Sequence, residues 1–291
     1  MTRKPGTSVT LKTIYLVFLA AFLLFLFVPL IINGILAFNN DEVPSFPWRG
    51  ATLGWFYSAD DGQVGVFNDA KMIRAITTSL RVAVFVTIFS LVVGTTTSFL
   101  FVRENFWGKQ ALYFAIIAPL VIPGVILGIS ILVFFHGIIG ILKSIVGPEL
   151  ARDLARPLRP GGLLVSLGQF SFIGTIATLV ISARLRKFPV EQEEAAMDLG
   201  SSRWGAIFSV TIPFLFPALL SAGILAFLLS FENFSTTLFL IGPKPTLPIF
   251  LYSRLRFFIT PEINAISVIL MGGTALLGLI AMSFRGRSET G

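Results

Sequence analysis

The sequence predicts an all-α membrane protein with six transmembrane helices. Of its 291 residues, 55% are hydrophobic and only 13% are charged, whereas a soluble domain carries about 25% charged residues. The mean hydropathy is +0.86. A bilayer core about 30 Å thick needs roughly 20 apolar residues for each helical crossing. Runs of that length that contain no Asp, Glu, Lys or Arg occur at 13–40, 82–102, 110–135, 160–183, 204–231 and 263–284.

These runs predict helices and not the strands of a barrel, because membrane strands alternate polar and apolar residues over about ten positions. The first run follows Arg3, Lys4 and Lys12, which resembles the basic start of a signal peptide. The apolar region of a signal peptide is about 7 to 15 residues long. Residues 14–32 alone are 19 uncharged residues, so we expect an uncleaved first helix.

Composition and single motifs exclude several other classes of function. The absence of cysteine excludes disulfides, thiolate metal sites and cysteine nucleophiles. The only histidine, His136, cannot assemble a zinc site by itself, and we expect no metal. Gly108-Lys109 lacks the rest of a phosphate-binding loop, so we expect no ATP hydrolysis and no catalytic residues. The net charge of +7 indicates contact with lipid headgroups; nucleic acid is not an expected partner.

The distribution of positive charge does not fix the orientation in the membrane. Six helices place both termini on the same side, and eleven Lys and Arg residues fall on each side of the predicted membrane. The basic N-terminus ahead of the first helix favours cytoplasmic termini.

The segment between the fourth and fifth runs is polar and helix-forming. It contains EQEEAAMDLGSSRWGAIFSVTIP at 191–213. Its residues predict two short helices that meet at Gly200, which closes the first in a left-handed conformation. Ser201 or Ser202 caps the second, which begins at Arg203, and Pro213 lies where the next membrane helix starts. The carboxylates of the first short helix are Glu191, Glu193, Glu194 and Asp198.

Composition alone fits a solvated connector, but the spacing is more specific. Glu194-Ala195-Ala196, Gly200 after three residues, and Val210-Thr211-Ile212-Pro213 after nine more resemble the EAA signature of the permease subunits of bacterial ABC importers, E-A-A-x3-G-x9-I-x-L-P. Val210 and Ile212 depart conservatively from that pattern. Other segments are similar to the second permease subunit of spermidine/putrescine transporters. These segments are 46–50, 52–56, 198–200, 230–234, 247–253 and 261–265.

The resemblance implies a single permease domain over 1–291 with the fold of a type I ABC importer. It implies a multi-pass protein of the bacterial inner membrane with cytoplasmic termini and a cytoplasmic coupling loop at about 184–212. The implied partners are a second homologous permease, two ATPase subunits that bind ATP and Mg, and an extracytoplasmic substrate-binding protein. The implied outer segments are about 41–75, 136–160 and 241–262. The residues expected to contact the ATPase are Glu193, Glu194, Ala195, Ala196, Asp198, Gly200 and Arg203.

Glu232 is the leading candidate for the substrate path, because ionisable groups at membrane depth are costly and tend to be functional. Its neighbours Phe231 and Phe234 would suit a polyamine, whose amines need carboxylates and whose methylenes pack on aromatic rings. Glu232 could instead pair with an arginine of the partner or end its helix at the outer interface. Gln169 is a weaker candidate at a position where the polyamine branch often has histidine. Permeases for iron(III), aminophosphonates or amino-acid derivatives therefore remain alternatives.

Two further segments have open roles. Pro119, Pro123, Gly124 and Gly128 in the third run suit either a moving gate or ordinary helix packing. Within 136–160, an amphipathic stretch could lie on the membrane, and its arginines could reach lipid phosphate or the binding protein. A self-contained carrier or channel is the alternative from a different class, but the sequence has neither the internal repeats nor the several intramembrane charges expected of one.

Overall fold

The computed structural model describes residues 9–60, 63–256 and 260–286. These residues are mostly helical, with one short antiparallel pair, β1 (Ala59–Asp60) and β2 (Gln63–Val64). Packing divides the chain into two compact units, Met1–Asp69 with Leu255–Gly273, and Ala70–Arg254 with Thr274–Gly291. The prediction of one permease domain over the whole chain stays a prediction.

The prediction of six membrane helices is confirmed. Six helices of the described residues are long and apolar enough to cross a membrane: Leu11–Leu36, Ala70–Arg103, Gly124–Val146, Gly162–Leu185, Arg203–Phe231 and Pro261–Leu279. Five of them overlap the predicted apolar runs closely. The third differs, because the run at 110–135 is divided between two helices.

The first unit contains α1 (Val9–Leu36), α2 (Gly54–Tyr57), the β1–β2 pair and the first part of α13 (Pro261–Gly286). Buried Asn39 organises the connection after α1. Its side-chain oxygen accepts a hydrogen bond from the backbone N–H of Arg49 (2.8 Å), and its carbonyl accepts one from Nε1 of Trp55 (2.9 Å). The predicted outer segment 41–75 therefore contains an ordered turn, a short helix and the β1–β2 pair, and its last residues begin α3 (Ala70–Arg103).

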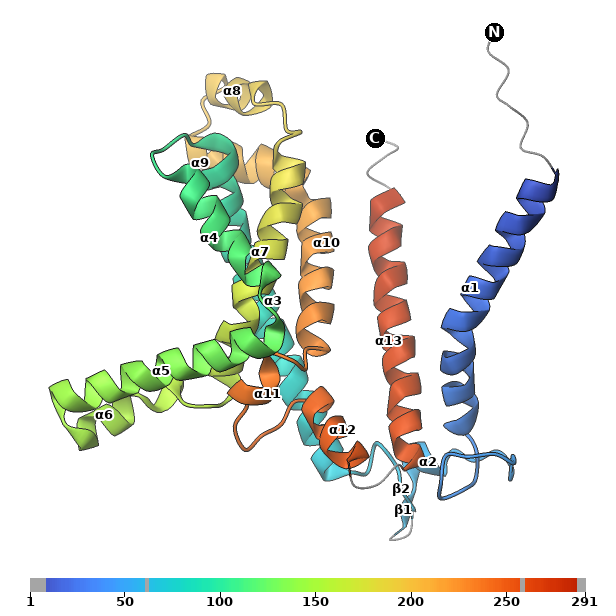
Figure 1. Cartoon of the computed structure of the whole chain (residues 1–291). Coiled ribbons are helices and arrows are strands. Elements are labelled where there is room, and N and C mark those ends of the chain that lie inside the picture. The colour runs from blue at the N-terminus through green and yellow to red at the C-terminus, as the bar shows by residue number, and fades with distance from the viewer. Residues whose placement is uncertain (1–8, 61–62, 257–259, 287–291) are drawn as a thin grey trace. The chain divides into compact units, whose positions relative to one another are not determined.

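Three long helices, α3 (Ala70–Arg103), α7 (Gly162–Leu185) and α10 (Ile212–Phe231), pack against one another in the second unit. In Figure 1, α3 and α7 run toward the end that carries α8 (Glu191–Asp198), and α10 runs back from that end beside them. Small residues bring α3 and α7 close together, since a Cβ added at Gly94 would lie 3.1 Å from Cβ of Ala177. Ser98 of α3 donates to the carbonyl of Thr178 (2.9 Å). Close backbone approach through small and hydroxyl residues is typical of membrane helices.

The third apolar run does not form one helix. It is divided into α4 (Lys109–Val121) and α5 (Gly124–Val146), and Ile122 and Pro123 between them are extended. The physical reason is that a proline disfavours helical geometry at the residue before it and cannot donate a backbone hydrogen bond. The expected helix over 110–135 is therefore wrong beyond residue 121. Figure 1 shows α5 running across the direction of α4.

Short helices fill the remaining connections of the second unit. α6 (Pro148–Leu154) and the 3-10 turn η1 (Arg156–Leu158) follow α5. α8 (Glu191–Asp198), α9 (Arg203–Ala206) and the π-helical turn η2 (Ile207–Thr211) lead into α10. α11 (Thr237–Leu240) and α12 (Leu247–Leu255) follow α10. α12 lies within 241–262, one of the outer segments that the resemblance implies.

Candidate functional site

The EAA-like segment forms two short helices at one end of the second unit. α8 and α9 lie at the end where α3 turns into α4 and where α7 ends (Figure 1). Gly200 has φ +93°, as the sequence predicts. The N–H of Ser201 donates to Ala196 (3.0 Å) and that of Gly200 to Met197 (2.9 Å). This pair of hydrogen bonds is a Schellman motif, which ends α8 and satisfies its last carbonyls.

The second short helix begins at Arg203, as predicted, and its cap is Ser202. The side chain of Ser202 accepts a hydrogen bond from the backbone N–H of Gly205 (3.1 Å). Pro213 lies in the first turn of α10, directly after the π-helical turn η2, a position where a missing backbone N–H is tolerated. The two helices and the start of α10 are therefore joined without a flexible linker.

Glu193 anchors α8 to the long helices. Its Oε1 atom lies 3.2 Å from a guanidinium nitrogen of Arg103, at the end of α3, and also accepts a hydrogen bond from the hydroxyl of Thr211 in η2. The side chains of Arg103 and Glu193 are only 18% and 13% exposed. A pair shielded from water to this degree is screened less than a surface ion pair, so this contact fixes α8 to both α3 and the base of α10.

Aromatic rings and arginines continue this anchor into the bundle. The guanidinium carbon of Arg103 lies 5.4 Å from the ring centre of Phe188, which packs edge-on against Phe214 of α10 at 5.1 Å. On the other side, the guanidinium carbon of Arg184 lies 4.2 Å from the Phe214 ring centre. These contacts are within the range of a cation–π interaction. They connect the ends of α3 and α7 to the first turn of α10.

The other predicted coupling residues point away from the bundle or lie at its edge. Glu194, Ala195 and Asp198 are exposed, and Ala196 is partly buried. Arg203 makes an exposed ion pair of 3.6 Å with Glu104, next to the turn between α3 and α4. Two large apolar side chains are also exposed on this segment, Leu199 (91%) and Trp204 (71%). The outer side of α8 and α9 therefore carries carboxylates beside exposed apolar groups, and the structure shows no partner for either among the described residues.

Glu232 lies at the opposite end of α10 from α8. It is the C-cap of that helix and is exposed, and its side chain has no ion pair or hydrogen bond among the described residues. Phe231 stacks with Phe227 at 5.9 Å, and Phe234 packs edge-on against Tyr252 of α12 at 4.9 Å between ring centres. The structure thus brings together an available carboxylate and two aromatic side chains in the turn between α10 and α11.

Gln169 is fully buried in the chain, in contrast to Glu232. Its Nε2 atom donates to the hydroxyl of Thr237 (2.9 Å), and its Oε1 atom accepts from the hydroxyl of Ser230. Asn233 accepts from the backbone N–H (3.2 Å) and hydroxyl (2.9 Å) of the same Thr237. Gln169 therefore joins α7 to both sides of the turn that carries Glu232.

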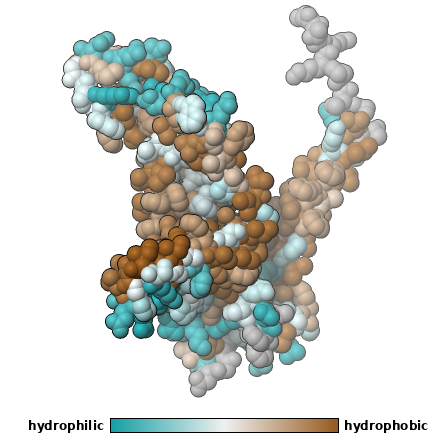
Figure 2. Space-filling view, turned by 60° about the vertical axis from the view of Figure 1, so that its left-hand side comes forward, coloured by the Kyte–Doolittle hydropathy of each residue, from teal (hydrophilic) through white to brown (hydrophobic). Residues whose placement is uncertain are grey.

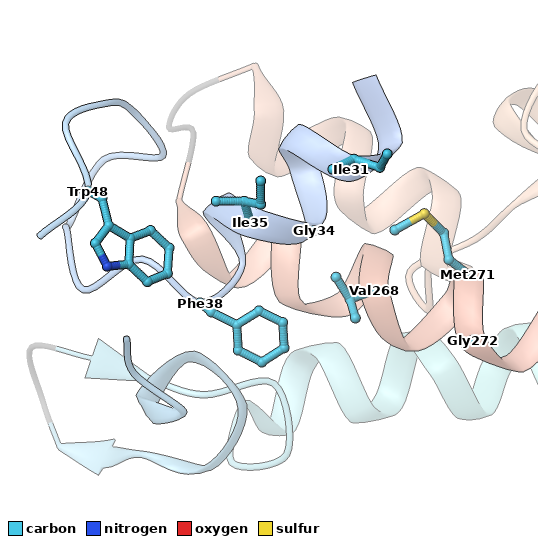
Figure 3. Close-up of a pocket in the computed structure, with 8 residues that line it drawn as sticks. All are labelled: Ile31, Gly34, Ile35, Phe38, Trp48, Val268, Met271 and Gly272. Carbon is cyan, nitrogen blue, oxygen red and sulfur yellow. The ribbon is translucent and has the colours of Figure 1, made fainter. Parts of the chain in front are cut away.

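Two pockets in the described residues do not suit a polycation. The larger, of about 690 Å³, lies in the first unit. Figure 3 shows its lining of apolar residues and glycines from α1, the segment after it and α13: Ile31, Gly34, Ile35, Phe38, Trp48, Val268, Met271 and Gly272. The smaller, of about 360 Å³, is lined in part by Arg81 and Lys244. The first has no carboxylate and the second would repel a cation.

Sequence reasoning missed the partners that hold this site together. Arg103, Phe188 and Phe214 lie in no motif, Thr211 occupies an unspecified position of the EAA-like pattern, and Arg103 is 90 positions from Glu193. The only signal was the position of Arg103 as the first charge after an apolar run. The sequence suggested that Glu232 lies at membrane depth within its helix. The structure corrects this, because Glu232 is the C-cap at the end of α10.

Comparison with known proteins gives the family. The profile described as "Binding-protein-dependent transport system inner membrane component" matches residues 87–290. The putrescine transport system permease protein PotI of Escherichia coli (strain K12) is 32% identical over 267 residues, covering 91% of this chain and 88% of PotI. The spermidine/putrescine transport system permease protein PotC of the same strain is 27% identical over 274 residues, covering 94% of each protein.

A solved structure shows the same fold. A chain of a bacterial alginate ABC transporter, in complex with an alginate pentasaccharide-bound periplasmic protein, superposes with a TM-score of 0.69 at 18% identity, covering 96% of this chain and 93% of that one. The six apolar helices and the permease relatives together indicate a multi-pass inner-membrane protein. The chain belongs to the family of binding-protein-dependent transport system inner membrane components.

Proposed function

We propose that this chain forms half of the translocation path of an ATP-driven importer for a polyamine such as putrescine or spermidine. The proposed complex contains a second, homologous permease, two ATPase subunits and an extracytoplasmic binding protein. The observation that carries the proposal is α8, an exposed helix fixed to the bundle by a shielded ion pair, on a chain similar to PotI and PotC.

The proposed role of α8 and α9 is to transmit movement of the ATPase subunits to the membrane helices. Glu194 and Asp198 would accept hydrogen bonds from the ATPase, and Leu199 and Trp204 would bury apolar surface against it. The contacts of Glu193 with Arg103 and Thr211 then carry the displacement to α3 and α10. In this assignment Glu193 is a positioning residue, because its carboxylate faces the bundle.

This assignment also proposes an orientation. The ATPase subunits are cytoplasmic, so the end that carries α8 lies at the cytoplasmic face, and both termini lie on that side. ATP and Mg bind to the partner subunits, and this chain hydrolyses no ATP. When ATP closes the ATPase pair, α8 and α9 move, the path opens toward the loaded binding protein, and hydrolysis resets it. A self-contained carrier would leave the exposed side of α8 without a partner.

Cross-linking tests the docking of α8. The chain has no native cysteine, so Leu199→Cys and Leu150→Cys each introduce a single thiol at an exposed leucine. In the assembled complex, we expect a thiol-to-amine cross-linker to join Leu199→Cys to an ATPase subunit. Leu150→Cys, on α6 at the other end of the unit, is the matched control. Equal cross-linking of the two variants, or none at Leu199→Cys, would refute the assignment.

We propose that Glu232 contacts the polyamine, with Phe231 and Phe234 supplying aromatic surface for its methylenes. Gln169 acts on the path indirectly, because its hydrogen bonds to Ser230 and Thr237 hold both sides of the Glu232 turn. Its burial gives it no surface of its own for the solute.

Uptake kinetics test the substrate proposal. Glu232→Gln removes the charge and keeps the shape of the side chain. We expect the putrescine concentration for half-maximal uptake into proteoliposomes to rise several-fold. Glu149→Gln, another exposed carboxylate at the same end of the unit, is the control and should leave that concentration unchanged. A normal value in the Glu232 variant would remove this residue from the path.

A further inference from the structure

The direction of the chain shows on which side α5 begins and ends. In Figure 1, α4 runs away from the end that carries α8, and α7 runs back toward that end. The intervening segment, 122–161, therefore starts and finishes at the same end of the bundle. α5 has 23 residues, which gives a length of about 34 Å, enough to cross a bilayer. If α5 crossed the membrane, α7 would begin on the side of the membrane that carries α8 and could not run toward that side, as it does in Figure 1.

The residues of α5 divide between two faces. Leu127 and Gly128 are buried, and a Cβ added at Gly128 would lie 2.7 Å from the carbonyl oxygen of Thr236. This face packs on α11. The opposite side is mostly apolar and exposed over a broad arc, because each four-residue step along the helix turns the side chain by about 40°. The exposed members at this spacing are Ile129 (41%), Val133 (64%), Ile141 (61%) and Ile145 (73%).

The short helix α6 after α5 is also amphipathic, with residues four apart sharing each face. Ala151 and Ala155 are fully buried, and α6 packs against α5. Leu150 (55%) and Leu154 (52%) are exposed on an adjoining side. The remaining side carries the acidic residues Glu149 and Asp153 and the cations Arg152 and Arg156. We call α5, α6 and η1 (124–158) the lateral arm.

Positive charge dominates the polar side of the lateral arm and its end. Lys143, Arg152, Arg156 and Arg159 are all exposed, and their side chains have no ion pair among the residues that the structure describes. The segment contains two acidic residues, Glu149 and Asp153. Figure 2, which brings this arm forward, shows brown residues over its side toward α8 and teal residues over the opposite side.

We propose that the lateral arm lies in the plane of the membrane at the far end from α8, with its apolar side in the acyl region and its cations at the phosphates of anionic phospholipid. In this arrangement α5 is an interfacial helix despite its length and hydropathy, and α4, whose 13 residues give about 20 Å, leads the chain from the α8 end to the arm. An amphipathic helix with cations on its polar side binds such an interface.

Three observations favour lipid over a protein partner. The apolar side of the arm faces the α8 end, and the apolar helices α7 and α10 lie between the arm and that end (Figures 1 and 2). The exposed apolar stripe is formed by aliphatic side chains with no carboxylate or amide among them. The excess of unpaired cations complements phosphate. The inference does not depend on the proposed function, because depth in a bilayer is measured without transport.

Spin-label depth measurements test the inference in the assembled complex, reconstituted in vesicles of phosphatidylethanolamine and phosphatidylglycerol. Because the chain has no native cysteine, nitroxides can be placed singly at Ile129→Cys, Val133→Cys, Ile141→Cys and Ile145→Cys. Collision with oxygen and with a water-soluble nickel chelate gives the depth of each label. We expect all four to be accessible to oxygen and shielded from nickel, with Ile129 and Ile145, at the two edges of the exposed arc, at similar depths. Labels at Arg152→Cys and Arg156→Cys should be accessible to nickel.

Each alternative gives a different result and would overturn the inference. A membrane-spanning α5 would place Ile129 and Ile145 at depths differing by up to about 24 Å, because sixteen residues rise 1.5 Å each. A contact with the partner permease would shield the stripe from both reagents. A docking site for the binding protein would leave the stripe accessible to nickel until that protein is added. Vesicles of phosphatidylcholine alone should bring the labels nearer to water, and no change would refute the role of the cations.

Discussion

Removing the carboxylate of Glu193 should release α8 from the bundle. The Glu193→Ala variant loses the 3.2 Å contact to Arg103 and the hydrogen bond from Thr211, and leaves Arg103 without its carboxylate. Exposed ion pairs contribute about 0–1 kcal/mol, and breaking a fully buried pair costs about 3–5 kcal/mol. Both side chains are less than one-fifth exposed, so we expect an intermediate cost. The free energy that holds α8 against the bundle should fall by about 2 kcal/mol, which shifts the equilibrium between docked and released α8 roughly thirtyfold.

Hydrogen exchange in the reconstituted complex measures this loss directly. When opening is a rapid pre-equilibrium, the amides of α8 should exchange faster by the same factor of roughly thirty, and those of α7 should not change. Glu191→Ala is the matched control, because Glu191 lies in the same first turn and is exposed. The Glu191→Ala variant also removes a carboxylate that interacts with the dipole of α8, but it keeps the contacts of Glu193 with Arg103 and Thr211. Equal exchange of α8 in the two variants would refute the reasoning.

The other predictions concern the bend, the buried amide and the contact of the lateral arm. Gly200→Ala should lower substrate-stimulated ATPase activity without unfolding the bundle, because a side chain at φ +93° costs about 1–2 kcal/mol; Gly137→Ala, in open space on α5, should not. Gln169→Leu should lower the thermal unfolding temperature of the complex, because it leaves the buried Ser230 hydroxyl without its acceptor, at a cost of about 1–3 kcal/mol; an unchanged temperature would contradict the buried network. Gly128→Ala should displace α5 from α11, because the added Cβ would lie 2.7 Å from the carbonyl oxygen of Thr236. Distances between spin labels on α5 and α11 should increase, and unchanged distances would be inconsistent with this packing.

Local chemistry accounts for the parts of the fold that the sequence predicted correctly. Long uncharged runs identified the membrane helices, and Gly200, Ser202 and Pro213 identified the bend, the cap and the start of α10. Each of these signals lies within a few residues of the structure it predicts. The break at Ile122–Pro123 was visible as a proline, but a proline in an apolar run fits a kink as well as a complete change of direction.

The parts that the sequence did not predict depend on residues far away in the chain. Glu193 and Glu194 are adjacent and chemically identical, yet one faces the bundle and the other is exposed, because Arg103 and Thr211 lie beside only one of them. Gln169 has partners 61 and 68 positions away. No local pattern distinguishes a buried, fully bonded amide from one that lines a path.

The most direct test of the account is the ATPase activity of the complete importer in lipid nanodiscs. The complex would contain this chain, its partner permease, the ATPase subunits and the binding protein, with a panel of polyamines, ferric ion, aminophosphonates and amino-acid derivatives. The account predicts that putrescine or spermidine stimulates hydrolysis and that Glu194→Lys abolishes the stimulation while the complex stays assembled. Stimulation by a different class of compound would refute the polyamine assignment, and full stimulation in the Glu194 variant would contradict the role of α8.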